Sequence, residues 1–290
     1  MKKALKIVFS VIGALLAIVV VAVFVLYLIG KSKFNDSYDY TPVITEVSSD
    51  SAAVARGAHV LAIEACRECH GENLAGNVIA DAPPFLIAAP NLTSGKGGIG
   101  AGYTPSDWDK AIRSGVAKDG RGLIIMPAEI YKNLSNQDAE ALIAYLQQVA
   151  PVDHELPKRE IRLLGYIIAA TAGPLTNTSE PGHAPAVTPE QAPTDEFGKY
   201  LATTSCEGCH GPKLDGIGAP GGDPDSPPPP SLAAAAAWSL DDFMATIRTG
   251  VNPNGRELQA KYMPWKSFRN MTDVELEALH THLQHVFAAH

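Results

Sequence analysis

The chain has 290 residues, of which 46% are hydrophobic, and its formal net charge is −8. This length is enough for two domains of ordinary size, each with a buried core. Residues 1–33 hold five lysines and no acidic residue, so the remainder has 23 − 5 = 18 basic and 31 acidic side chains, a net charge of −13. Such an acidic body argues against nucleic acid as a partner, and it leaves room for a docking partner with a basic face.

An apolar segment near the N-terminus predicts a transmembrane helix. Residues 7–29 form a run of 23 broken only by Ser10 and Gly13, with lysines on both sides, and about 20 such residues span a bilayer. A cleaved signal peptide has a shorter apolar core and then a small-x-small site, whereas the exit here reads LYLIGKSKF. We expect residues 1–33 to be an uncleaved, single-pass signal anchor in a bacterial cytoplasmic (inner) membrane. Residues 7–29 would contact lipid, with the rest of the chain on the periplasmic side; the alternative is a long signal peptide that is removed.

The remaining chain divides by composition into two units and their linkers. We expect a polar tether at 34–53, a first folded unit at 54–150, a connector at 151–195 and a second unit at 196–290. The connector is rich in Pro, Thr and Ala in its second half. Its first half contains the apolar stretch 163–173, which is too short to span a membrane. We expect this stretch to pack between the two units; the alternative is a second membrane contact or a docking surface.

The two units are an internal repeat. Residues 103–121 align without a gap with 238–256, and residues 126–149 align with 263–286. Each aligned stretch contains the spacing of a helix cap, Thr or Ser followed three residues later by Asp or Glu. At the front of each unit, Leu61 matches Leu201 on a helix that leads into the cysteines. Strand patterns are nearly absent, so the sequence predicts an all-α fold built from two similar small domains.

All four cysteines lie in two pentads, CRECH at 66–70 and CEGCH at 206–210. Cys-x-x-Cys-His at the end of a helix is the attachment signature of c-type haem. One helical turn places both thiols on the same side, where they add to the two vinyl groups of one porphyrin, and the histidine points at the iron. We therefore expect two covalently bound haems c, with these attachment cysteines and iron-binding histidines: Cys66, Cys69 and His70, and Cys206, Cys209 and His210.

Three other kinds of site use paired cysteines. A redox dithiol of the thioredoxin type needs a βαβ context, which this sequence lacks. Two Cys-x-x-Cys pairs can form one zinc site, but such pairs are usually about 15–20 residues apart, whereas these begin 140 apart, each in its own repeat. Two structural disulfides would suit an exported protein but leave both histidines unexplained.

Two methionines occupy matching places in the repeat. Met126 and Met263 lie opposite each other, each is followed by proline, and they follow the first cysteine of their unit by 60 and 57 residues. A thioether is a soft ligand that suits ferrous iron and raises its potential. We expect these two methionines to be the second axial ligands of the two irons; the alternative is that both are core residues.

Two further groups of residues are candidates for a role. Arg113 and Arg248 also correspond in the repeat, and each would pair with haem propionates, because guanidinium matches carboxylate geometry; the alternative is a surface arginine near a helix end. A histidine cluster lies near the C-terminus, and we expect it to be solvated rather than metal-binding: His280, His282, His285 and His290.

Both units resemble class I cytochrome c domains, on the motifs CRECHG…MP and CEGCHG…MP. In the first unit, PNLTSGKGGIGAGYTPSDWDKAIRSGVAKDGRGLIIMP followed by SNQDAEALIAYLQQVAPV resembles the cytochrome c subunits of membrane-bound alcohol and gluconate dehydrogenases. The resemblance covers about 50–150 and 196–290. It implies His70 and His210 as proximal ligands and Met126 and Met263 as distal ligands. Those subunits usually carry three haem motifs, whereas this chain has two.

Together these features predict a membrane-anchored dihaem cytochrome c, with two tandem class I domains behind one transmembrane helix. We expect it to carry single electrons on the periplasmic side between membrane-bound redox complexes: a dehydrogenase, a quinol–cytochrome c reductase or a terminal oxidase. One alternative is a catalytic dihaem protein such as a cytochrome c peroxidase, which needs an iron with an exchangeable sixth ligand. The other is a fixed cytochrome subunit of a larger respiratory or dehydrogenase complex.

Overall fold

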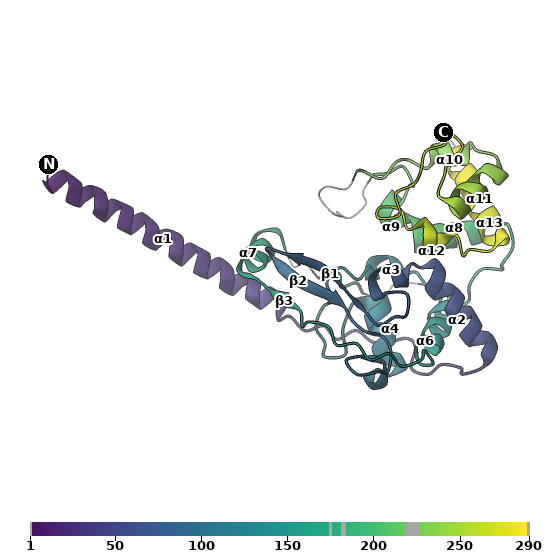
Figure 1. Cartoon of the computed structure of the whole chain (residues 1–290), viewed down its shortest axis with the longest axis horizontal. Coiled ribbons are helices and arrows are strands. Elements are labelled where there is room, and N and C mark those ends of the chain that lie inside the picture. The colour runs from purple at the N-terminus through teal and green to yellow at the C-terminus, as the bar shows by residue number, and fades with distance from the viewer. Residues whose placement is uncertain (1, 174–175, 181–183, 218–226, 289–290) are drawn as a thin grey trace.

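The computed structural model describes residues 2–173, 176–180, 184–217 and 227–288. Helix α1 (Lys2–Phe34) projects away from the two folded units (Figure 1). Among the described residues it is the one helix long and apolar enough to cross a membrane, and none of its apolar window is buried in the protein.

The first unit is built mainly from short helices. They are α2 (Ser51–Ile63), α3 (Cys66–His70), η1 (Gly100–Gly102), α4 (Pro105–Ser114), α5 (Ala128–Tyr131) and α6 (Asn136–Leu146). Both predicted caps are present: Thr104 and Asp107 form a capping box at α4, and the Ser135 hydroxyl accepts from the backbone N–H of Asp138 at 3.0 Å in α6. Gly115 ends α4 in the left-handed conformation, with φ of 65°.

The second unit repeats this order. It contains α8 (Asp195–Leu201), the π-helical turn η2 (Ala202–Cys206), α9 (Glu207–His210), α10 (Ala233–Ala236), α11 (Leu240–Thr249), α12 (Trp265–Phe268) and α13 (Asp273–Ala288). Ser239 caps α11, and the Thr272 hydroxyl accepts from the backbone N–H of Glu275 at 3.2 Å at the start of α13. The predicted caps are therefore present in both units.

In each unit the first helix crosses the terminal helix at a glycine. A Cβ atom on Gly57 of α2 would lie 2.5 Å from the carbonyl carbon of Ala141 in α6, and one on Gly198 of α8 would lie 2.6 Å from that of Ala278 in α13. Only glycine allows backbones to approach this closely. Gly57 therefore corresponds to Gly198, which pairs Val60 with Leu201. The Leu61–Leu201 match expected from the sequence is wrong by one residue. The first unit has one more residue than the second between the crossing glycine and the first cysteine of the pentad.

A small sheet departs from the expectation that strands are nearly absent, although the fold is mostly helical as predicted. Strands β1 (Asn77–Ala82), β2 (Phe85–Ala89) and β3 (Glu160–Ile161) form an antiparallel sheet in the order β1-β2-β3. Pro83 and Pro84 make the two-residue turn between β1 and β2. Val78 and Ile79 of β1 and Phe85 and Ile87 of β2 supply the β-branched and aromatic side chains that favour strands.

The apolar stretch of the connector forms helix α7 (Leu163–Ala172), and the prediction that it packs between the units is wrong. The Tyr166 ring lies against the Phe34 ring, with centroids 5.7 Å apart, and Lys33 Nζ donates to the carbonyl of Ala169 at 2.9 Å. Strand β3 explains this position, because it pairs with β2 and carries the chain to the base of α1 (Figure 1).

The segment expected to be a polar tether packs on the first unit. Ile44 is only 2% exposed, and the backbone N–H groups of Val43 and Ile44 donate to the Asp109 carboxylate at 2.7 and 3.1 Å. A buried carboxylate in α4 needs such donors. This segment therefore links α1 to the first unit as an ordered strap.

Candidate functional site

Each pentad lies on a short helix that directly follows the first helix of its unit. In the first unit, Ala65 adopts a left-handed conformation (φ 55°) that turns the chain from α2 into α3. In the second unit, η2 leads into α9 without such a residue. The two cysteines of each pentad are three positions apart, which is close to one helical turn. The structure thus places each cysteine pair on one helical turn that ends at a buried histidine.

The cysteine side chains do not support a disulfide or a redox dithiol. All four are free thiols, so the structure does not show the disulfides that the sequence left open. Burial, and in smaller part the nearby Glu64 carboxyl, raises the pKa of both Cys66 and Cys206 to about 12. A redox dithiol instead needs a cysteine with a lowered pKa.

The two histidines are held by a contact that is the same in both units. Nδ1 of His70 lies 2.9 Å from the carbonyl oxygen of Pro90, and Nδ1 of His210 lies 2.9 Å from that of Pro230. A carbonyl only accepts, so Nδ1 carries the proton and Nε2 keeps its lone pair. Burial lowers the pKa of both imidazoles, which favours the neutral form. This is the tautomer and orientation that a metal ligand needs.

These two prolines were not identified from the sequence, although a signal was present. Pro90 follows His70 by 20 residues, and Pro230 follows His210 by 20 residues. The surrounding sequences, AAPNL and PPPSL, otherwise share little. The shared role is carried by the backbone carbonyl, which any residue possesses, so only the equal spacing indicated it.

Each methionine lies beside the same core as the pentad of its unit. Met126 and Cys66 both pack against the buried cluster of the first unit, and Met263 and Cys206 both pack against that of the second. All four side chains are partly buried. A short helix follows each Met-Pro pair, α5 in the first unit and α12 in the second. The structure therefore brings each predicted pentad and its methionine to one common core.

Two buried donors in the first unit test whether a haem would fit there. Trp108 Nε1 and Arg113 Nη2, both on α4, have no hydrogen-bond partner among the described residues. Buried donors without partners are rare in proteins. The carboxylates of haem propionates would satisfy both, so the residues of the first unit fit the group.

Arg113 and Arg248 make corresponding hydrogen bonds in the two units. Arg113 is buried and donates to Asp109 at 2.6 Å and to Asn136 at 2.7 Å, while Arg248 donates to Asp273 at 2.7 Å and to the carbonyl of Arg269. Asn136 and Asp273 are the first residues of the two terminal helices. Each arginine therefore connects its helix to the start of the terminal helix, and Arg113 is not the surface residue that the alternative described.

The expectation that the C-terminal histidines are solvated is wrong for two of them. His280 is 5% exposed and its Nε2 lies 3.1 Å from the carbonyl of Trp238, and His282 is 7% exposed and pairs with Asp195 at 2.7 Å. His285 is mostly exposed and contacts the same carboxylate. His282 is buried against Gly198 of α8, and His280 is buried against Trp238 and the Phe243 ring. His290 lies outside the described residues.

Comparison with known proteins gives matches to both units. Residues 52–146 match the family model described as cytochrome c oxidase, cbb3-type, subunit III, and residues 196–287 match the model described as cytochrome c. The fructose dehydrogenase cytochrome subunit of Gluconobacter japonicus is 29% identical over 276 residues, which cover 83% of this chain and 54% of that protein.

Two further relatives extend this result. The cytochrome c subunit of the alcohol dehydrogenase (quinone) of Gluconacetobacter polyoxogenes is 30% identical over 70% of this chain and 49% of its own length. The gluconate 2-dehydrogenase cytochrome c subunit of Pantoea cypripedii is 36% identical over 38% of this chain and 26% of its own length. The chain thus spans about half the length of the first two relatives. The matches confirm the resemblance inferred from the sequence.

Proposed function

We propose that this chain, which consists of two cytochrome c domains behind an N-terminal apolar helix, carries single electrons as a cytochrome c subunit of a membrane-bound dehydrogenase system. The observation that carries the proposal is the repetition of one arrangement. In each unit, a pentad and a Met-Pro pair lie beside the same buried cluster. Two equivalent sites of this kind suit the passage of electrons through the protein better than catalysis at one of them.

The residues that would hold two haems c are the two cysteine pairs, the two histidines and the two methionines. A haem iron, when bound, accepts and releases one electron. The carbonyls of Pro90 and Pro230 hold His70 and His210 in one orientation, which the protein keeps in either redox state. With Met126 and Met263 as second ligands, neither site has a position for an exchangeable substrate.

The base of α1 supports the proposal that it stays attached as an anchor. Tyr166 of α7 packs on Phe34, and its backbone carbonyl lies against Gly30 so closely that a Cβ there would overlap it. These contacts make the end of α1 part of the first unit, unlike a leader that is removed. The proposed location is the bacterial cytoplasmic membrane, with a single span and both units on the periplasmic side, where haem c and an acidic docking surface would meet redox partners.

The relatives guide the choice of partner. Their names describe cytochrome subunits of fructose, alcohol and gluconate dehydrogenases. We therefore place a membrane-bound dehydrogenase as the electron donor, with a quinone, a quinol–cytochrome c reductase or a terminal oxidase on the accepting side. The net charge of −13 outside residues 1–33 would attract a partner with a basic face.

Carbon monoxide binding to the reduced, full-length protein tests this function. We expect the wild-type protein to bind almost none, Met126→Leu and Met263→Leu to bind one molecule per chain each, and the double variant to bind two. Both haems should stay attached in every variant, as shown by intact mass. Binding of one carbon monoxide per wild-type chain would instead indicate a catalytic dihaem protein. Unchanged spectra in both single variants would refute the ligand assignment.

A further inference from the structure

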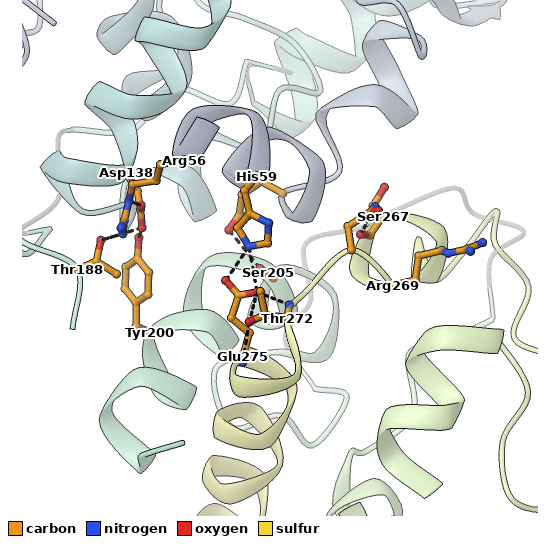
Figure 2. A network of polar contacts seen from close by, with 12 residues as sticks. Arg56, His59, Asp138, Thr188, Tyr200, Ser205, Ser267, Arg269, Thr272 and Glu275 are labelled. Atoms are coloured by element: carbon orange, nitrogen blue, oxygen red, sulfur yellow. Dashed lines mark hydrogen bonds and ion pairs between the residues drawn. The ribbon is translucent and has the colours of Figure 1, made fainter. Parts of the chain in front are cut away.

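The two units contact each other through the same elements, used reciprocally. Figure 2 shows His59 of α2, in the first unit, pointing to Glu275 at the start of α13 in the second. Nε2 of His59 lies 2.8 Å from Oε1 of Glu275. In the reverse direction, the hydroxyl of Tyr200 in α8 donates to Oδ2 of Asp138 at the start of α6 at 2.6 Å.

These four residues occupy equivalent positions in the repeat. The crossing glycines, Gly57 and Gly198, align α2 with α8, and this register pairs His59 with Tyr200. The gapless alignment of 126–149 with 263–286 pairs Asp138 with Glu275. Each unit therefore extends one side chain from its first helix to the carboxylate in the first turn of its neighbour's terminal helix. This is the pattern of a twofold-symmetric interface, in which each contact occurs twice.

A second contact follows the same symmetry. The Ser267 hydroxyl of α12 donates to Glu68 of α3 at 3.0 Å. The equivalent pair is Ile130 of α5 and Gly208 of α9, where a Cβ on the glycine would lie 2.9 Å from the isoleucine side chain. Glu68 and Gly208 are the third residues of the two pentads. The interface therefore includes both attachment segments.

The centre of the interface lies between the cysteines of the two units. The Ser205 hydroxyl donates to the buried Glu64 carboxyl at 3.2 Å, and the Cys66 thiol lies 4.0 Å from the Glu64 backbone carbonyl. The Tyr131 hydroxyl donates to the Glu64 backbone carbonyl at 2.6 Å. Ser205 directly precedes Cys206, and Glu64 lies two residues before Cys66, so the Ser205–Glu64 hydrogen bond joins the two attachment segments.

The connector breaks the symmetry on one side only. The Thr188 hydroxyl donates to Asp138 at 2.9 Å and accepts from Arg56 at 2.8 Å. Arg56 also pairs with Asp138 at 2.5 Å (Figure 2). The Tyr200–Asp138 contact is therefore reinforced, whereas the His59–Glu275 contact has no such support from the connector among the described residues.

We propose that the two haem units form a pseudo-twofold pair, fixed by the His59–Glu275 and Tyr200–Asp138 contacts, which holds the attachment helices α3 and α9 together so that electrons pass directly between the two haems. This inference rests on the proposed electron-transfer function. Two directional contacts fix the relative orientation of two rigid bodies more tightly than one. His59 and Tyr200 are accordingly positioning residues, and the orientation that they fix would set the rate of exchange between the haems.

Spin labels on the full-length protein, carrying both haems, test this arrangement. Glu140 of α6 and Glu277 of α13 are exposed and occupy equivalent positions, so each is replaced by cysteine and labelled with a nitroxide. The dipolar distance is measured in the ferrous protein. The variants are His59→Phe, Tyr200→Phe and their combination, with His59→Gln as the rescue, because glutamine still donates to Glu275. Tyr145→Phe is the control, since its hydroxyl makes none of these contacts.

We expect one narrow distance in the wild-type protein, the control and His59→Gln. Each phenylalanine variant should raise the separated population roughly tenfold, the scale of losing one charged hydrogen bond. Electron exchange between the haems after rapid partial reduction should slow in step and recover in His59→Gln. An unchanged narrow distance in the double variant, or a broad one in the wild-type protein, would overturn the proposal. Neither result affects carbon monoxide binding, which tests the proposed function separately.

Discussion

Adding one methyl group at Gly57 should strongly destabilise the first unit. The new Cβ would lie 2.5 Å from the carbonyl carbon of Ala141 and 2.8 Å from the Cβ of Tyr145, whereas ordinary contacts begin at 3.4 Å. Helices α2 and α6 would have to separate by at least 3.4 − 2.5 = 0.9 Å, because a backbone carbonyl cannot move aside as a side chain can. Overpacking of this kind costs up to about 3 kcal/mol, which is a large part of the stability of a small domain.

Thermal unfolding of the full-length chain, followed by calorimetry and by circular dichroism of the haem bands, measures this effect. For a domain of this size about 3 kcal/mol corresponds to a fall in Tm of roughly 12–24 °C. Gly102→Ala is the matched control, because a Cβ at Gly102 meets nothing within 4 Å. If Gly57→Ala lowered the Tm no more than Gly102→Ala, the assignment of this glycine as the crossing point of the two helices would be wrong.

Three other predictions concern charged residues and the anchor. Hydrogen bonding to Glu275 raises the pKa of His59. The contact between the two side chains should therefore be strongest below a pH of about 6.5 and weaken as the pH rises through the raised pKa of His59. The distance between the spin labels in His59→Gln should be independent of pH. Arg113→Ala should lower the free energy of unfolding by about 3 kcal/mol, because it leaves Asp109 buried without its ion pair. Arg248→Ala should lower it by less than about 1 kcal/mol, because its ion pair is more exposed. Equal losses for the two variants in denaturant unfolding would contradict this prediction. Intact mass of the protein from its native membrane should include the residues of α1 and two haems, and a mass without α1 would refute the anchor.

The repeated features of this protein were accessible from the sequence because they depend on side-chain identity at fixed spacing. The helix caps at Thr104 and Ser239 were predicted correctly, since a hydroxyl three residues before an acidic side chain satisfies free N–H groups wherever a helix begins. The mostly helical fold and the relation to cytochrome c subunits were also predicted.

Other features depend on tertiary contacts that leave little trace in local sequence. Helix α7 is apolar on all sides, so its pattern did not indicate which neighbour would cover it; β3 pairing with β2 places it against α1. The proline carbonyls that hold His70 and His210 belong to the backbone, and only their equal spacing indicated them. The contact between the units uses His59 in one unit and Tyr200 at the equivalent position of the other. These are different side chains, and their equivalence becomes clear only when the two crossing glycines fix the alignment of α2 with α8.

Isolation of this protein from its native membrane in a mild detergent tests the central claim most directly. The complex is purified through this chain, its components are identified by mass spectrometry, and the reduction of its haems is followed after addition of ethanol, fructose or gluconate. The account predicts that a dehydrogenase subunit accompanies the chain and that one substrate of that subunit reduces both haems. A chain that is isolated alone, and whose haems are reduced by no dehydrogenase substrate in intact membranes, would contradict it.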